Sequence, residues 1–360
     1  MPFSELIGQD RARRVLIQAL ARRSLHHAYL FGGPAGVGKG TLARLVAQSA
    51  NCEGGPALSA GVREASPSDE GPSARDPCGT CRPCRKIARG THPDVLYVSE
   101  ERVMARAGSW EPKAGRTPSK DIVVDQIRDL VDRRLALKRF EGRSRFVILD
   151  PADAMNVQAQ NALLKTLEEP PEATTFLLLA SKADLLLPTV RSRCARVAFA
   201  PLGEAVLEAR LGAKGRTEEE ARLAAALSGG SLGRALELDA RDLSERARAV
   251  TAATELDPHD AGSWIAFARE YGGDREGARE VLGLLEVFLR DVLVAQEGSP
   301  VSLALKDLTP RSCEFGAALG PAEVLRRLEA VREAAEGLKQ NAAPVLALER
   351  MLIGWFHGAG

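Results

Sequence analysis

The glycine-rich stretch from Gly33 to Thr41, Gly-Pro-Ala-Gly-Val-Gly-Lys-Gly-Thr, can bind phosphate. In the pattern G-x-x-x-x-G-K-[S/T], backbone N–H groups face phosphate oxygens, the lysine reaches the outer phosphates and the hydroxyl binds Mg²⁺. Here Gly40 occupies the hydroxyl position and Thr41 comes one residue late. A turn that binds nothing is the alternative. We predict a site for ATP and Mg²⁺ formed by Gly33, Gly36, Gly38, Lys39, Gly40 and Thr41.

An aspartate follows a continuous apolar run at residues 146–149. Phosphate-loop enzymes place at such a position the acid that holds Mg²⁺ through water, so Asp150 is predicted to join the site. ATPases of the AAA+ class have a glutamate next, which polarises the attacking water, whereas this chain has Pro151, which has no proton acceptor. Asp153 is the alternative base, but we expect it on the following turn, pointing elsewhere. The chain is therefore predicted not to hydrolyse ATP by itself.

Four cysteines, Cys52, Cys78, Cys81 and Cys84, have spacing typical of a metal site. The last three form C-x-x-C-x-x-C, in which a tight turn can aim several sulfurs at one tetrahedral ion. In a reducing compartment such a cluster favours a metal over disulfides. We predict structural Zn²⁺ in a knuckle spanning 52–84, with redox cysteines or an iron–sulfur cluster as alternatives. Cys194 and Cys313 are expected to be buried thiols.

The elements that must position these residues are read from the apolar pattern. Residues 28–31, 146–149 and 176–180 are continuous apolar runs, typical of strands in a parallel sheet covered on both faces. Helical spacing follows the loop at 42–47 and returns at 121–137. Strand and helix patterns thus alternate, which predicts an α/β domain.

The organisation along the chain predicts three regions. Strand patterns stop after about residue 201, and helical patterns broken by glycines continue to the end. We expect an α/β nucleotide-binding domain at 1–201, a small helical domain at 202–240 and a C-terminal helical domain at 241–360. Within the first, residues 53–76 are rich in Gly, Pro, Ser and Ala, which predicts a mobile insertion in the cysteine knuckle.

Composition excludes few functions. The chain has 360 residues, of which 45% are hydrophobic, and its 49 Lys and Arg nearly balance its 48 Asp and Glu. Bulk charge therefore does not indicate nucleic-acid binding, and any DNA contact would come from local patches. Neither a signal-peptide pattern nor an apolar run long enough to span a bilayer is apparent, so we expect a cytoplasmic protein with no membrane partner.

Several runs together resemble the clamp-loader subunits of bacterial DNA polymerase III. They are His27–Phe31, Thr91–Asp94, Leu163–Pro171 and Leu187–Cys194, the last including Ser-Arg-Cys, together with the cysteine knuckle. The resemblance covers residues 3–240 well and the remainder only in its helical character. It implies an AAA+ phosphate-loop domain with an inserted zinc knuckle, a helical lid and an all-α collar, assembled in a heteropentameric ring. The implied partners are motor ATPase subunits, a delta subunit, the sliding clamp and primed DNA.

Two subunit types compete within that family. The motor type keeps G-K-[S/T] and Asp-Glu and hydrolyses ATP, whereas the delta-prime type has degraded versions of both and keeps Ser-Arg-Cys. Gly40 and Pro151 make this chain similar to the delta-prime type. The resemblance then implies that Arg193 is an arginine finger for the ATP of a neighbouring subunit, a role suited to a permanently charged, forked guanidinium. A surface salt bridge is the alternative for Arg193.

Two further residues take roles from the resemblance alone. Ser181 matches the polar position that senses the γ-phosphate, and Arg234 matches the sensing arginine of the lid; a helix cap and a solvated arginine are the alternatives. For the whole chain, two other functions stay open: a motor-type ATPase that uses Thr41, and a small nucleotide kinase resembling adenylate kinase, which also writes its loop Gly-Lys-Gly-Thr.

Overall fold

The computed structural model describes residues 2–54, 76–113, 115–238, 243–298, 303–305 and 308–357. The chain divides into two compact units: Met1–Gly203 with Ser231–Gly233, and Glu204–Gly230 with Arg234–Gly360. The three predicted domain boundaries stay a prediction. Most of the predicted mobile insertion, residues 55–75, lies outside the described residues.

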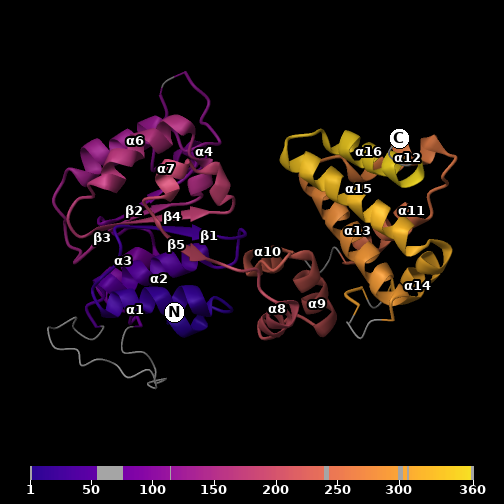
Figure 1. Ribbon diagram of the computed structural model, residues 1–360, viewed down its shortest axis with the longest axis horizontal. Helices are drawn as coiled ribbons and strands as arrows, with labels where there is room; N and C mark the ends of the chain where they lie inside the picture. Colours follow the sequence, from indigo (N-terminus) through magenta and orange to yellow (C-terminus); the bar gives the residue numbers. More distant parts are fainter. Residues whose placement is uncertain are drawn as a thin grey trace. The chain divides into compact units, whose positions relative to one another are not determined.

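The first unit is built on a parallel sheet of five strands in the order β2-β3-β4-β1-β5 (Figure 1). Every residue of β3 and β4 is buried. This burial is expected of a parallel sheet with helices on both faces. The strands are β1 (Ala28–Gly32), β2 (Val95–Val98), β3 (Arg145–Leu149), β4 (Thr174–Ala180) and β5 (Ala195–Ala198).

The sequence patterns identified β1, β3 and β4 and missed the two edge strands. In β5 only Val197 is buried, so the strand lacks the continuous apolar run that marks a strand buried on both faces. The run in β2 is only four residues long and comes directly after the polar Thr91–Asp94 segment. In this sheet, apolar runs therefore predict the central strands and not the edge strands.

Helices cover both faces of the sheet. Figure 1 shows α1, α2 and α3 on one face and α4, α6 and α7 on the other. Alternate strand residues point to opposite faces, so Phe31 and Leu177 join the core under α2, while Leu30 and Leu178 join the core under α6. The helical segments are η1 (Phe3–Glu5), α1 (Asp10–Ala21), α2 (Lys39–Asn51), α3 (Arg82–Ala88), α4 (Glu101–Arg106), α5 (Val124–Arg128), η2 (Asp129–Leu135), η3 (Ala152–Ala154), α6 (Val157–Glu168), η4 (Ala183–Leu185) and α7 (Pro188–Arg191).

The helix predicted over 121–137 differs from the structure at its start. Ile122 forms a parallel bridge with Met155, and α5 begins only at Val124. The segment then continues as the π-helix η2 to Leu135. The periodic apolar positions predicted the burial of Ile127, Leu130 and Leu135, since burial depends on the face and not on the exact hydrogen-bond pattern.

In its described residues the second unit consists of helices joined by turns and loops, as the sequence predicted. The long helix α13 packs against α14, α15 and α11, and its Phe288 is fully buried. None of the helices described has a stretch long and apolar enough to cross a membrane. The helices are α8 (Glu204–Gly212), α9 (Glu218–Leu227), α10 (Leu232–Glu237), α11 (Leu243–Thr254), α12 (Ala261–Tyr271), α13 (Arg275–Gln296), α14 (Thr309–Ala318), α15 (Pro321–Lys339) and α16 (Pro344–His357).

A buried carboxylate, Asp94, fixes the loop that leads into β3. It is 1% exposed and accepts backbone N–H bonds from Phe140 at 2.9 Å, Glu141 at 2.9 Å and Gly142 at 2.7 Å. Arg145, at the start of β3, lies 3.7 Å from the same carboxylate. Burial alone would raise the pKa of Asp94, but the backbone donors and Arg145 outweigh it, so the pKa lies below its ordinary value.

We predict that Asp94→Asn lowers the free energy of unfolding by about 2 kcal/mol, because hydrogen bonds to a charged group contribute roughly 1.5–3 kcal/mol. A depressed folded-state pKa stabilises the fold above the unfolded-state pKa, and this contribution is lost as pH falls through the folded-state pKa. Urea unfolding at neutral and acid pH should therefore show the wild type and variant converging in acid. The exposed Asp132→Asn serves as control; equal effects of the two substitutions would contradict the anchoring role.

Candidate functional site

The phosphate loop lies between β1 and α2, and its shape requires glycine. Gly38 has a φ of +106°, and a Cβ there would lie 2.8 Å from Leu6 Cδ1. A Cβ on Gly33 would lie 2.2 Å from the Phe199 carbonyl oxygen, a contact that no side chain can make. The glycines therefore serve both the positive φ of the turn and its close packing. Helix α2 begins at Lys39, so the loop leads to a helix N-terminus, where anions are favoured.

Lys39 is buried, and oxygens of its own chain surround it. Its Nζ donates to the carbonyl oxygen of Gly33 at 2.5 Å, to that of Pro34 at 2.6 Å and to Ser181 Oγ at 3.4 Å. An ammonium has three donors, so all of them are engaged. Burial lowers the pKa of Lys39, and the negative charges of Asp150 and Asp153 oppose that change. An incoming phosphate would exchange carbonyl contacts for a charged acceptor.

The displaced hydroxyl position faces Asp150. A Cβ built on Gly40 would lie 3.4 Å from Asp150 Oδ2. Thr41 is the next residue of α2 and is therefore rotated about 100° around the helix. Desolvation raises the pKa of Asp150, Lys39 lowers it, and Asp153 adds to the increase. Lys39 and Asp150 thus lie together at the end of the sheet strands. The hydroxyl that usually binds Mg²⁺ from residue 40 is absent, because that residue is glycine.

The acid considered as a substitute base is engaged by backbone donors. The Asp153 carboxylate accepts N–H bonds from Ser181 at 3.2 Å and from Lys182 at 2.8 Å, at the end of β4. Asp153 lies on the following turn, η3, as expected, and its carboxylate is held at the end of β4, where its charge still affects the pKa of Lys39 and of Asp150. Pro151, directly after Asp150, offers no side-chain acceptor. The geometry therefore suits phosphate binding better than activation of a water.

Arg193 lies just beyond α7, with one third of its side chain exposed. Its Nη1 donates to the Thr189 carbonyl oxygen at 2.9 Å, and its Nη2 forms an ion pair with the Glu168 carboxylate. Glu168 is the last residue of α6. Sequence reasoning missed this partner, although Glu168 belongs to the Leu-Glu-Glu-Pro run that carried the resemblance.

The two residues predicted to be sensors, Ser181 and Arg234, have different surroundings. Ser181 comes to the loop, since its hydroxyl lies within 3.4 Å of Lys39 Nζ. Arg234 belongs to the second unit, where its guanidinium lies 3.9 Å from the position of a Cβ on Gly283 in α13. The neighbouring Gly233 donates its N–H to the Gly36 carbonyl oxygen at 3.0 Å. The sensing roles of Ser181 and Arg234 stay predictions.

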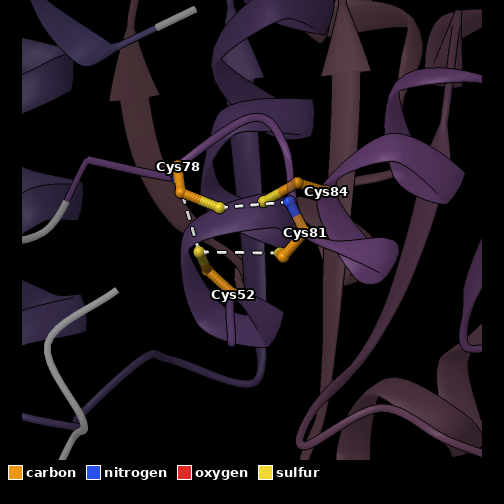
Figure 2. A group of neighbouring side chains, drawn as sticks. All are labelled: Cys52, Cys78, Cys81 and Cys84. Carbon is orange, nitrogen blue, oxygen red and sulfur yellow. Dashed lines mark hydrogen bonds between the residues drawn. The ribbon is translucent and has the colours of Figure 1, made fainter. Parts of the chain in front are cut away.

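The four cysteines converge as predicted (Figure 2). Their sulfurs all lie within 4.8 Å of one another, and the Cys52 and Cys81 sulfurs are 3.9 Å apart. Sulfurs bound tetrahedrally to Zn²⁺ at about 2.3 Å would be about 3.8 Å apart, so the spacing fits such an ion. The backbone N–H of Cys81 is the main factor that lowers the pKa of Cys78, to about 5, which favours the thiolate. This cluster can hold a metal ion.

The two remaining cysteines differ from each other. Cys194 is buried, as predicted, and burial raises its pKa to about 11. Cys313 is exposed, so the expectation of a buried thiol was wrong there. In α14 the buried positions are Ser312 and Gly316, which leaves Cys313 on a different side of the helix.

Comparisons with known proteins find relatives among the subunits of DNA polymerase III. A family model described as DNA polymerase III, delta subunit, matches residues 8–203. A DNA polymerase III subunit delta' of Pseudomonas aeruginosa is 38% identical over 223 residues, which are 61% of this chain and 58% of that protein. A subunit delta' of Bacillus subtilis is 27% identical over 355 residues, 96% of this chain and 95% of that protein.

A third relative belongs to another subunit type. The DNA polymerase III subunit tau of Escherichia coli is 33% identical over 192 residues, 53% of this chain and 24% of that protein. The match thus spans about a quarter of that tau subunit and just over half of the Pseudomonas relative.

We predict that the purified chain carries one Zn²⁺, measurable by atomic emission spectrometry. Removal of the metal by a chelator, or Cys81→Ser, should lower the melting temperature, because a bound structural metal stabilises the folded state. Cys313→Ser is the matched control, because that thiol is exposed and outside the cluster. A metal-free chain with unchanged melting temperature would exclude a structural zinc site.

Proposed function

Since the chain belongs to the DNA polymerase III delta-subunit family, whose model matches residues 8–203, we propose that it acts in DNA replication as a clamp-loader subunit of the delta-prime type. It would join motor ATPase subunits and a delta subunit in a heteropentameric ring that loads the sliding clamp onto primed DNA. Two relatives named subunit delta' support this subunit type. In this proposal residues 1–201 form an AAA+ domain, 202–240 a lid and 241–360 a collar.

The observation that carries the proposal is a phosphate cradle with no water-activating base. Lys39, Asp150 and Ser181 gather at the loop, but Pro151 follows Asp150, and the Asp153 carboxylate accepts N–H bonds from Ser181 and Lys182, the two residues after β4. General-base catalysis needs an acceptor within hydrogen-bond reach of the attacking water. Such a site can retain ATP and Mg²⁺ and still leave hydrolysis to a neighbour.

Arg193 supplies the proposed catalytic contribution in a neighbouring subunit's site. Its side chain is one third exposed, so a neighbouring surface can reach it. The permanent charge and planar fork of arginine can stabilise negative charge that develops on a transferring phosphoryl group. The zinc knuckle would have a structural role, because four thiolates leave Zn²⁺ no open coordination position.

A motor-type ATPase is the second candidate. It is favoured by the intact Lys39 and Asp150 geometry and by the 33% identity to a tau subunit. It would need a base other than Pro151 and a hydroxyl ligand other than residue 40. The nucleotide-kinase alternative is set aside because the family match covers the whole phosphate-loop domain.

We predict that Arg193→Ala lowers the ATPase of a clamp loader reconstituted with the motor and delta subunits, clamp and primed DNA. Arginine fingers contribute roughly 10³–10⁵-fold to rate in related phosphoryl transfers, so a loss of at least tenfold is expected even where several sites share turnover. Lys39→Ala in this chain should change the rate little.

The matched control is Arg196→Ala, three residues on, on the exposed side of β5. An equal loss from Arg196→Ala would point to general damage to the interface. A large loss from Lys39→Ala with none from Arg193→Ala would favour the motor-type candidate.

We also predict that the isolated chain binds ATP with Mg²⁺ and does not turn it over. Titration with a fluorescent ATP analogue should show binding that weakens in Lys39→Ala, because the ammonium no longer pairs with the outer phosphates. Phosphate release should stay at background. Turnover by the purified chain that disappears in Lys39→Ala would contradict the proposal.

A further inference from the structure

The ion pair between Arg193 and Glu168 points to a role for the carboxylate. We infer that Glu168 is the resting partner of Arg193: it holds the guanidinium until the phosphate of a nucleotide on the neighbouring subunit takes its place. This role deepens the proposed function and rests on it, because it presumes that Arg193 acts in a neighbour's site.

The surroundings of Arg193 leave its side chain, and not its backbone, able to exchange partners. The backbone is fixed, since Arg193 N–H donates to the Val190 carbonyl oxygen at 3.2 Å, and the next residue, Cys194, is buried. Nη1 is anchored to the Thr189 carbonyl oxygen at 2.9 Å. Only Nη2 is given to a charged group, Glu168 on α6. While Nη1 stays bonded to Thr189, Nη2 can exchange Glu168 for another acceptor, and the guanidinium keeps its orientation.

Because the pair is exposed, replacing Glu168 by a phosphate costs little free energy. The side chains of Arg193 and Glu168 are 33% and 48% exposed, and pairs of this kind contribute little net stability. A phosphate competes well for such a guanidinium, because it carries more negative charge than the carboxylate. The ion pair with Glu168 therefore orients the Arg193 guanidinium, but its free energy is small enough for a phosphate to displace the carboxylate.

The second unit contains a contrasting pair. Arg327 is 10% exposed and bonded to Glu323, and its guanidinium lies over the rings of Phe315, Trp355 and Phe356 at 5.2–5.5 Å. Such burial fixes the arginine as part of a core, because breaking a buried pair leaves an uncompensated charge. Arg193 lacks such cover, as an exchangeable cation requires.

A carboxylate beside the finger also opposes the engaged state. It offsets part of the charge of Arg193 and repels the incoming phosphate, since two anions would share one guanidinium. Removing the charge of Glu168, while keeping its shape, should therefore shift Arg193 toward the neighbour's nucleotide.

The test is single-turnover ATP hydrolysis by the reconstituted clamp loader, followed by rapid quench. Glu168→Gln should raise the hydrolysis rate by about two- to fivefold, the upper figure corresponding to about 1 kcal/mol, the most that an exposed pair contributes. Glu169→Gln is the matched control, an exposed glutamate one residue on. The double variant Glu168→Gln/Arg193→Ala should hydrolyse no faster than Arg193→Ala, since Glu168 acts only through the arginine.

The outcomes separate the two levels of the proposal. If Arg193→Ala slows hydrolysis while Glu168→Gln behaves as Glu169→Gln does, or slows it as well, the resting-partner role is overturned and the finger stands. If Arg193→Ala has no effect, the finger itself fails, and Glu168 loses its role with it. Melting temperatures are measured for every variant, including Glu168→Ala. A change in rate without a change in melting temperature reports the loss of the charge and not a loss of folded protein.

Discussion

The whole site depends on the need of buried backbone groups to pair with one another. Strands β3, β4 and β1 lie inside the first unit, away from water, so their N–H and C=O groups must be satisfied within the sheet. Parallel pairing does this, with Leu149 beside Leu178 and Gly32 beside Ala180. One consequence is that the residues just after these strands, Gly33, Asp150 and Ser181, emerge at the same edge. Their convergence follows from strand register, and the start of α2 brings Lys39 to the same edge.

Lys39 and Arg193, the two cations of the proposed function, are both paired with oxygens of their own chain. The Lys39 ammonium donates to carbonyl oxygens of its own loop, with the charges of Asp150 and Asp153 nearby, whereas the Arg193 guanidinium pairs directly with the charge of Glu168. The difference matches their burial, because a buried ammonium needs every donor engaged, while an arginine side chain that is one third exposed can also bond to water. Each cation is thus kept in place without an anion from outside, and each would release oxygens of its own chain on binding phosphate.

Sequence patterns predicted those features that depend on composition and short spacing. The glycine loop, strands β1, β3 and β4 and the three cysteines within 78–84 could be read from the chain, because each depends on residue type within a short stretch. Cys52 lies 26 residues before Cys78 and was joined to them by its residue type. The partners of Arg193 and Asp94 could not be read, since Glu168 is 25 residues from Arg193 and Phe140 is 46 from Asp94. Such pairs are set by the packing of separate elements. The exposure of Cys313 depended likewise on which side of α14 faces its neighbours.

The hydrogen bond between Gly233 and Gly36 has a topological consequence. The chain leaves the first unit after Gly203, returns for Ser231–Gly233 beside the phosphate loop, and leaves again at Arg234. The two units are therefore joined by three covalent crossings. A single break in the chain cannot separate them into complete pieces, because a cut after residue 203 takes Ser231–Gly233 away with the second unit. Genetic dissection of this protein would thus remove part of the loop's own packing along with the helical unit.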